Sequence, residues 1–196
     1  MAWFAGECRR LGVEVPSVFI ETGAYRGDNI AEVLQSPEFR EVHSIELSEK
    51  WKSHCEERFQ NENRVHLHLG DSAEVLERFL PTLDQNVPIL IYLDAHYSGG
   101  ETAGEDIDKG CPVLRELDIL KKHRKDCVGD VYVVDDIRLM GKASWSGNEG
   151  STIYPRTFFD FTHVSIAEML TKMDHKKWSL SHYPDRLVFY GRTNHA

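Results

Sequence analysis

Apolar runs of strand length alternate with segments of helical period along most of this chain, which is the pattern of a parallel sheet covered by helices. The predicted strands are Val18–Glu21, Val42–Glu46, Val65–Leu69, Ile89–Asp94 and Val131–Asp135. The predicted helices between them are Asp28–Leu34, Glu49–Gln60, Ala73–Leu83 and Pro112–His123. We therefore predict an α/β fold, with a Rossmann-like doubly wound sheet and helices on both faces.

The two ends of the chain add further predicted elements. They are a leading helical segment over residues 1–16 with its helix at Trp3–Leu11, a helix at Ile166–Met173, and two closing strands at Trp178–His182 and Leu187–Tyr190. The chain has 196 residues, of which 41% are hydrophobic, and this is enough to build one core. We therefore expect residues 1–196 to form a single domain.

Composition limits the partners of the chain. Its formal net charge of −9 at pH 7 opposes binding to nucleic acid, whose phosphates attract basic surfaces. No apolar stretch approaches the roughly 20 residues that span a bilayer, and the apolar start is too short for a signal peptide. The four cysteines form no C-x-x-C pair, so free thiols are expected. These features predict a cytoplasmic protein without nucleic-acid or membrane partners.

Carboxylates end four of the five predicted strands. They are Glu21, Glu46, Asp94 and Asp135. The carboxyl ends of parallel strands form the ligand crevice in open α/β sheets. We therefore expect these four side chains to converge on one rim.

A glycine turn comes after the first predicted strand, in the run Glu21-Thr22-Gly23-Ala24-Tyr25-Arg26-Gly27. Gly23 is free to take a backbone conformation closed to residues with a Cβ, and Gly27 lets the next helix approach its strand. Such a turn lets a nucleotide cofactor touch the backbone. Because Glu21 repels phosphate but attracts an ammonium or sulfonium group, the turn suits S-adenosylmethionine better than NAD.

Later polar residues extend this nucleotide pattern. Glu46 lies 19 positions after Gly27, at the end of the next strand, where an acidic residue accepts hydrogen bonds from ribose hydroxyls. The alternative for Glu46 is a solvated strand-end residue. Asp71 and Ser72 come after the third strand, where they either meet an adenine amine or cap a helix.

In this order of motifs the chain resembles the class I S-adenosylmethionine-dependent methyltransferases, from about Val18 to Tyr190. The resemblance implies a seven-stranded, mainly parallel sheet closed by a C-terminal antiparallel strand. It places the methionine part at the glycine turn, the ribose at Glu46 and the adenine at Asp71 and Ser72. The cofactor-binding set that it implies is Glu21, Thr22, Gly23, Tyr25, Gly27, Glu46, Asp71, Ser72 and Asp94. Tyr25 departs from the family pattern, because many members carry a third glycine there.

Within that class, the turn is similar to that of the macrocin O-methyltransferase group, which uses a divalent metal. Its ligands are an Asp at the end of strand four and paired Asp residues at the end of strand five. The resemblance therefore implies Mg²⁺ at Asp94, Asp135 and Asp136. A hard cation also relieves the repulsion among three carboxylates. The alternative for Asp135 and Asp136 is an exposed turn in which one carboxylate caps the next segment of the chain.

The implied reaction is methyl transfer to oxygen of a small hydroxylated acceptor. A metal bound to two vicinal oxygens lowers the pKa of a hydroxyl and places it in line with the sulfonium methyl. Asp94 and His96 are the candidate catalytic residues, with His96 as the candidate base. The alternatives for His96 are an orienting donor and a passive loop residue. Catechol-type enzymes have a lysine shortly after the strand-four Asp, whereas this chain has Ala95-His96-Tyr97 there.

Two loops flank the predicted site. Tyr97–Asp106 is rich in glycine and acid, and either closes over the substrate, extends the metal site or is a flexible insertion. Residues 141–163 are expected to form a loop near the acceptor site, beginning with the Gly- and Ser-rich Gly141–Ser151. Aromatic side chains of this region either line an acceptor pocket or pack against the sheet. They are Trp145, Tyr154, Phe158, Phe159 and Phe161.

Two other functions remain open from sequence. An NAD-linked oxidoreductase also uses a glycine turn and a ribose-binding acid, but Glu21 and the missing G-x-G-x-x-G spacing count against it. A cofactor-binding module without catalysis keeps the same fold. The acceptor is open among sugars, phenols and natural-product scaffolds, and nitrogen is a further acceptor atom if no metal takes part. A homo-oligomer is also left open.

Overall fold

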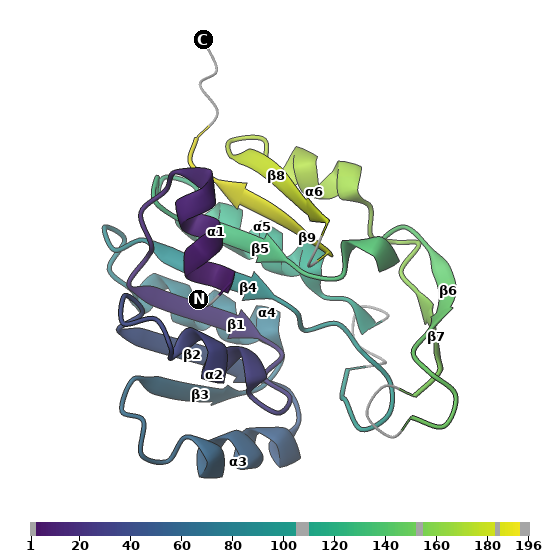
Figure 1. Cartoon of the computed structure of the whole chain (residues 1–196). Coiled ribbons are helices and arrows are strands. Elements are labelled where there is room, and N and C mark those ends of the chain that lie inside the picture. The colour runs from purple at the N-terminus through teal and green to yellow at the C-terminus, as the bar shows by residue number, and fades with distance from the viewer. Residues whose placement is uncertain (1–2, 105–109, 152–154, 183–184, 193–196) are drawn as a thin grey trace.

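The computed structural model describes residues 3–104, 110–151, 155–182 and 185–192. Its main sheet has seven strands in the order β3-β2-β1-β4-β5-β9-β8 (Figure 1). They are β1 (Val18–Thr22), β2 (Glu41–Glu46), β3 (Val65–Leu69), β4 (Ile89–Leu93), β5 (Val131–Val134), β8 (Lys177–His182) and β9 (Asp185–Tyr190). The first five are parallel, and β9 is antiparallel to both β5 and β8. The predicted fold class is confirmed.

Helices cover both faces of this sheet (Figure 1). One face carries α1 (Trp3–Leu11), α2 (Asp28–Val33) and α3 (Glu49–Arg58), and the other carries α4 (Ser72–Phe79), α5 (Val113–Arg124) and α6 (Ile166–Lys172). Successive side chains of β1 enter different cores, so Phe19 and Ile20 pack on opposite faces. Strands buried on both faces need apolar residues at successive positions, which explains the apolar runs in the sequence.

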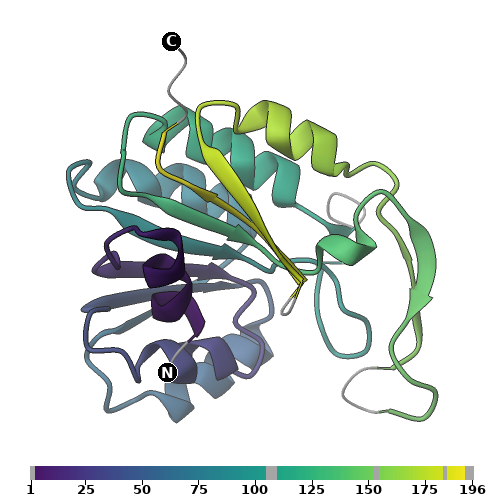
Figure 2. The same ribbon diagram turned by 45° about the horizontal axis from the view of Figure 1, so that its top comes forward.

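Residues 141–163, which were expected to form a loop, contain two strands. Strand β6 (Ala143–Ser146) pairs antiparallel with β7 (Thr157–Asp160) in a separate two-stranded sheet. This hairpin lies beside the main sheet and not within it (Figure 2). Trp145 and Phe158 face each other across the two strands, with ring centroids 5.6 Å apart. This cross-strand aromatic pair stabilises the hairpin. The Gly and Ser residues of this region had favoured the prediction of a loop.

One predicted helix is shorter than expected. The sequence predicted Ala73–Leu83, but α4 ends at Phe79 and is succeeded by a 3₁₀ turn over Leu80–Thr82. Pro81 lies in that turn, and proline cannot donate the backbone hydrogen bond that continues an α-helix. Within the described ranges, no helix is both long enough and apolar enough to cross a membrane.

A buried ion pair fixes the end of the sheet where β4 and β5 begin. Arg124 donates from Nε and Nη2 to the two carboxylate oxygens of Asp130, at 2.9 and 2.8 Å, and both side chains are fully buried. The same carboxylate accepts the backbone N–H of Ile89 at 3.0 Å. Asp130 therefore joins α5 to the first residue of β4.

Asp130→Ala is expected to lower the free energy of unfolding by about 3–5 kcal/mol, because it leaves the Arg124 charge buried without its partner. Urea denaturation measures this loss. Asp126→Ala, which breaks an exposed pair with Arg192, is the matched control and should cost no more than about 1 kcal/mol. Equal losses in the two variants would contradict a structural role for Asp130.

Candidate functional site

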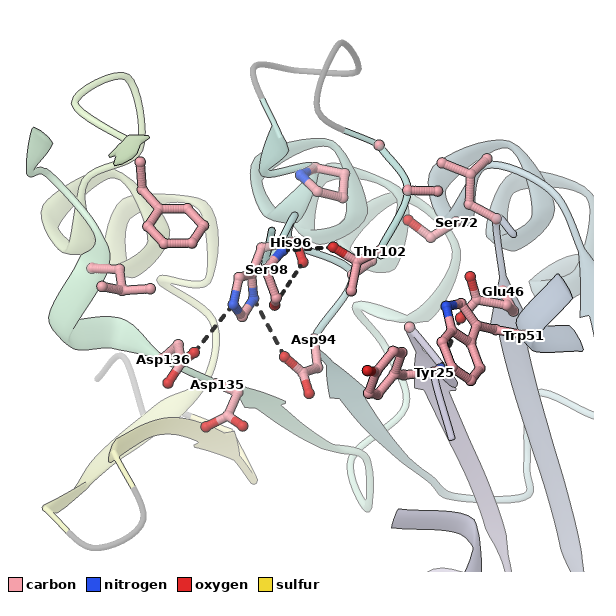
Figure 3. Close-up of a pocket in the computed structure, with 18 of the residues that line it drawn as sticks. Tyr25, Glu46, Trp51, Ser72, Asp94, His96, Ser98, Thr102, Asp135 and Asp136 are labelled. Carbon is pink, nitrogen blue, oxygen red and sulfur yellow. Dashed lines mark hydrogen bonds and ion pairs between the residues drawn. The ribbon is translucent and has the colours of Figure 1, made fainter. Parts of the chain in front are cut away.

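A cavity of about 600 Å³ opens at the carboxyl ends of the parallel strands (Figure 3). Its floor and walls come from the ends of β1, β2, β4 and β5 and from the start of α4. The segment after β4 and the β6–β7 hairpin form the opposite side. Of the predicted site residues, the cavity is lined by Gly23, Tyr25, Glu46, Asp71, Ser72, Asp94, His96, Asp135 and Asp136. The topology therefore brings together residues that are far apart in the sequence.

The glycine turn is shaped by the close approach of β1 to β4. Gly23 has a φ of 87°, and a Cβ at this position would lie 2.5 Å from the backbone oxygen of Asp94. Gly27 has a φ of 78°, and its Cβ would meet the Phe59 ring at 2.6 Å. Both glycines have a positive φ, which favours glycine. The close neighbour of Gly27 is Phe59 rather than the strand that the sequence predicted, and Gly27 does not line the cavity.

Tyr25 and Glu46 form one wall. The backbone N–H of Tyr25 donates to Oε2 of Glu46 at 2.8 Å, and that of Ser48 donates to Oε1 at 2.7 Å. These bonds hold the carboxylate at the end of β2. The Tyr25 ring lies against Trp51, with centroids 4.4 Å apart, and Trp51 also lines the cavity. Sequence reasoning missed Trp51, although an aromatic residue in the first turn of the helix after Glu46 was a usable signal.

Glu21 and Thr22 lie below the cavity and do not line it. The Glu21 side chain is fully buried, with Oε1 accepting from the Ser44 hydroxyl at 2.7 Å. Burial raises the pKa of Glu21 to about 8, although the Ser44 bond opposes this rise. Thr22 Oγ1 accepts the backbone N–H of Asp94 at 3.2 Å. The two side chains therefore connect the end of β1 to β2 and to the residue that follows β4.

Asp71 caps a helix, which is one of the two roles that the sequence left open, and it also lines the cavity. Its Oδ1 accepts the backbone N–H of Glu74 at 2.9 Å, at the start of α4. Arg115 of α5 donates to the same carboxylate at 3.1 Å. Ser72, the first residue of α4, lines the same wall.

His96 lies between two carboxylates on the other side of the cavity (Figure 3). Its Nδ1 is 3.3 Å from Asp94 Oδ1, and its Nε2 is 3.1 Å from Asp136 Oδ2. Burial raises the pKa of Asp94 to about 7, against the opposing effect of His96. Burial disfavours the charged imidazole, but the hydrogen bond to Asp136 and the nearby carboxylates raise the net pKa of His96. The ionisation of His96 is therefore linked to that of the two carboxylates beside it.

Asp135 is turned toward another set of partners. Arg186 of β9 donates from Nε to Oδ1 of Asp135 at 3.2 Å, and the Tyr92 hydroxyl donates to Oδ2. Among the described residues, no group of three His, Cys, Asp or Glu side chains is arranged to hold a metal ion. The predicted ligands Asp94, Asp135 and Asp136 thus line one cavity but, in this arrangement, do not fit a shared metal.

The segment after β4 connects the two sides of the cavity. Trp51 Nε1 donates to the backbone oxygen of Glu101 at 3.1 Å, and Lys50 pairs with the Glu101 carboxylate at 2.7 Å. At the other side, a Cβ on Gly99 would lie 2.1 Å from Oγ1 of Thr157 in the hairpin. The predicted loop Tyr97–Asp106 is therefore packed on both sides up to residue 104, and its residues 105–106 lie outside the described ranges.

Two aromatic residues of the hairpin region are buried, and two are exposed. Phe159 is buried and lines the cavity, and Phe161 is buried in the core. Trp145 and Phe158 are 60% and 52% exposed, so neither predicted role describes them. Tyr154 lies outside the described residues.

No protein-family model and no curated protein sequence matches this chain. Solved structures do match it. The methyltransferase PaMTH1 of Podospora anserina, bound to S-adenosylhomocysteine (SAH), is 16% identical with a TM-score of 0.62, covering 97% of this chain and 77% of its own. The O-methyltransferase TomG of Streptomyces achromogenes, in complex with S-adenosylmethionine, is 12% identical with a TM-score of 0.58, covering 98% and 79%. An SAH-bound O-methyltransferase of Bacillus cereus is 11% identical with a TM-score of 0.57, covering 98% and 80%.

Glu21→Gln is expected to gain stability relative to the wild type as the pH rises. The pKa of Glu21 is raised from 4.5 to about 8 in the folded chain, so the fold favours the protonated acid. The wild type therefore loses stability as pH increases from the unfolded to the folded pKa, and the Gln variant has no such loss. Urea unfolding of both proteins at about pH 5 and about pH 8 measures the difference. A constant difference would show that Glu21 ionises with an ordinary pKa.

Proposed function

We propose, from the class I methyltransferase fold of this chain and the geometry of its cavity, that the protein is an S-adenosylmethionine-dependent methyltransferase acting on oxygen of a small hydroxylated molecule. The observation that carries this proposal is one continuous cavity at the strand ends. It is bounded by the Tyr25–Glu46 wall on one side and by the Asp94–His96–Asp136 unit on the other. A cofactor and an acceptor therefore have separate, adjoining places.

The cofactor occupies the side of the cavity at the glycine turn. Glu46 retains lone pairs on both carboxylate oxygens after accepting from Tyr25 and Ser48, and these lone pairs accept hydrogen bonds from the ribose hydroxyls. Trp51 and Tyr25 supply an apolar wall beside the ribose. Asp71 and Ser72 lie at the adenine end. Gly23 exposes its backbone to the methionine part, because a side chain there has no room.

The acceptor occupies the side lined by the rim carboxylates and the hairpin. Phe159 and Pro155 offer apolar contacts, while Ser146 and Asn148 offer polar ones. An acceptor hydroxyl at Asp94 attacks the sulfonium methyl. The oxygen–carbon bond forms as the sulfur–carbon bond breaks, which leaves neutral SAH and a methyl ether. The hydroxyl proton passes to the Asp94–His96 pair, whose Asp94 has a pKa raised to about 7 and thus suits proton transfer near neutral pH.

Magnesium assistance and the narrower likeness to the macrocin O-methyltransferase group remain predictions from sequence. The proposed transfer includes no metal-dependent step, because Asp94 and Asp136 both face His96 and Asp135 pairs with Arg186. A cytoplasmic location, a homo-oligomer and the lack of nucleic-acid or membrane partners also remain predictions. Calorimetry that compares SAH with NAD⁺ separates this function from the oxidoreductase alternative.

Wild-type protein is expected to bind SAH and not NAD⁺ in a calorimetric titration. Glu46→Gln should weaken SAH binding by about tenfold, because one carboxylate acceptor becomes an amide donor facing the ribose. Glu49→Gln is the control, since Glu49, the first residue of α3, is exposed and does not line the cavity. Binding of NAD⁺ in place of SAH would overturn the proposed function.

Mg²⁺ titrated into the free protein is expected to show no saturable binding, because Asp135 is held by Arg186 while Asp94 and Asp136 share His96. Calorimetry measures this directly and needs no acceptor. Saturable binding that Asp94→Asn abolishes would contradict the arrangement and support the magnesium prediction.

A further inference from the structure

Glu116 is a buried acid that the proposed reaction does not use. It lies in the first turn of α5 and is 0% exposed. Neither of its carboxylate oxygens has a regular hydrogen bond to any residue in the described part of the chain. A buried polar group without such a bond lowers stability, and an apolar side chain of similar size would be less costly there. The presence of an acid at position 116 is therefore not explained by the stability of the fold.

Of the two hydroxyl groups around Glu116, that of Ser72 belongs to a residue that lines the cavity, whereas Thr22 does not line it. Burial raises the pKa of the Glu116 carboxyl, and the nearby hydroxyls of Ser72 and Thr22 oppose this rise. Ser72 Oγ is itself buried without a regular partner among the described residues. Thr22 Oγ1 already accepts the Asp94 N–H, so its own proton is free for Glu116.

These contacts link three elements that meet at the cavity. Ser72 begins α4 at the adenine end, Thr22 ends β1, and Asp94 comes directly after β4. Hydrogen bonds in free enzymes are often long or poorly aligned and tighten when the ligand binds. We infer that Glu116 is a positioning residue for the cofactor, which holds Ser72 and Thr22 so that the start of α4 and the end of β1 fit bound SAH. This inference rests on the proposed function.

The electrostatic surroundings are consistent with this role. Asp71 and Arg115 are the charged groups that act on Glu116, the first raising and the second lowering its pKa. Burial is the largest influence and raises the pKa of Glu116 to about 7. In either protonation state the carboxyl retains an oxygen that accepts from a hydroxyl.

The experiment compares wild type, Glu116→Met and Glu116→Gln by SAH calorimetry and by thermal unfolding. Glu116→Met removes the acceptor oxygens but keeps a side chain of similar length, so SAH affinity should fall by about tenfold. Its Tm should rise, because an unpaired buried acid is replaced by an apolar group. Glu116→Gln retains a carbonyl acceptor and should bind SAH nearly as tightly as the wild type. A merely structural residue would lose stability and affinity together.

Asp118→Asn is the matched control, because Asp118 lies on the same helix but is exposed and pairs with Lys172. Its SAH affinity should equal that of the wild type. Unchanged affinity in Glu116→Met, or a Tm that falls or a variant that does not fold, would overturn the inference while leaving the proposed function intact. If the wild type binds no SAH, the proposed function fails, and the inference fails with it.

Discussion

The close approach of β1 and β4 is the constraint on which the site depends. At Gly23 the two strand ends are too near for any side chain, and a Cβ would lie 2.5 Å from the Asp94 oxygen. The N–H of Asp94 is held at the same junction by Thr22. This contact places the glycine turn beside the acid that begins the other side of the cavity. The two sides of the cavity that we propose for the cofactor and the acceptor therefore adjoin, because these two central strands lie close together.

Buried acids surround that junction on both faces of the sheet. Glu21 lies on the face of α1 and α2, and Glu116 reaches the junction from α5 on the opposite face. Burial raises the pKa of Glu21, Asp94 and Glu116 toward neutrality. Such groups lower the stability of the free protein, and strongly perturbed carboxyl groups gather at functional sites. The buried Arg124–Asp130 pair stabilises the opposite end of the same strands.

Much of the fold can be predicted from sequence patterns because each pattern is local. Successive apolar residues marked the central strands, and the glycine turn marked the end of β1. The hairpin was missed because its strands have only four residues each and β6 lies within a Gly- and Ser-rich segment. The pair between Trp145 and Phe158 joins strands that are separated in the sequence. The end of α4 was placed too late because its apolar pattern continues through the 3₁₀ turn that contains Pro81.

The sequence by itself determined which acids stand at the strand ends, since parallel strands place their carboxyl ends on one edge. It also determined that Gly23 and Gly27 lie in the turn, where both adopt the positive φ that favours glycine. It did not show that Tyr25 between them has a positive φ of 44° as well. Only the tertiary structure decided where each carboxylate points. Arg186, 51 positions after Asp135, pairs with that side chain, while His96 lies between Asp94 and Asp136. Glu116 reaches Ser72 only because α5 packs beside α4. The orientation of a buried charged side chain depends on partners that folding brings from distant parts of the chain. A local sequence pattern does not identify these partners.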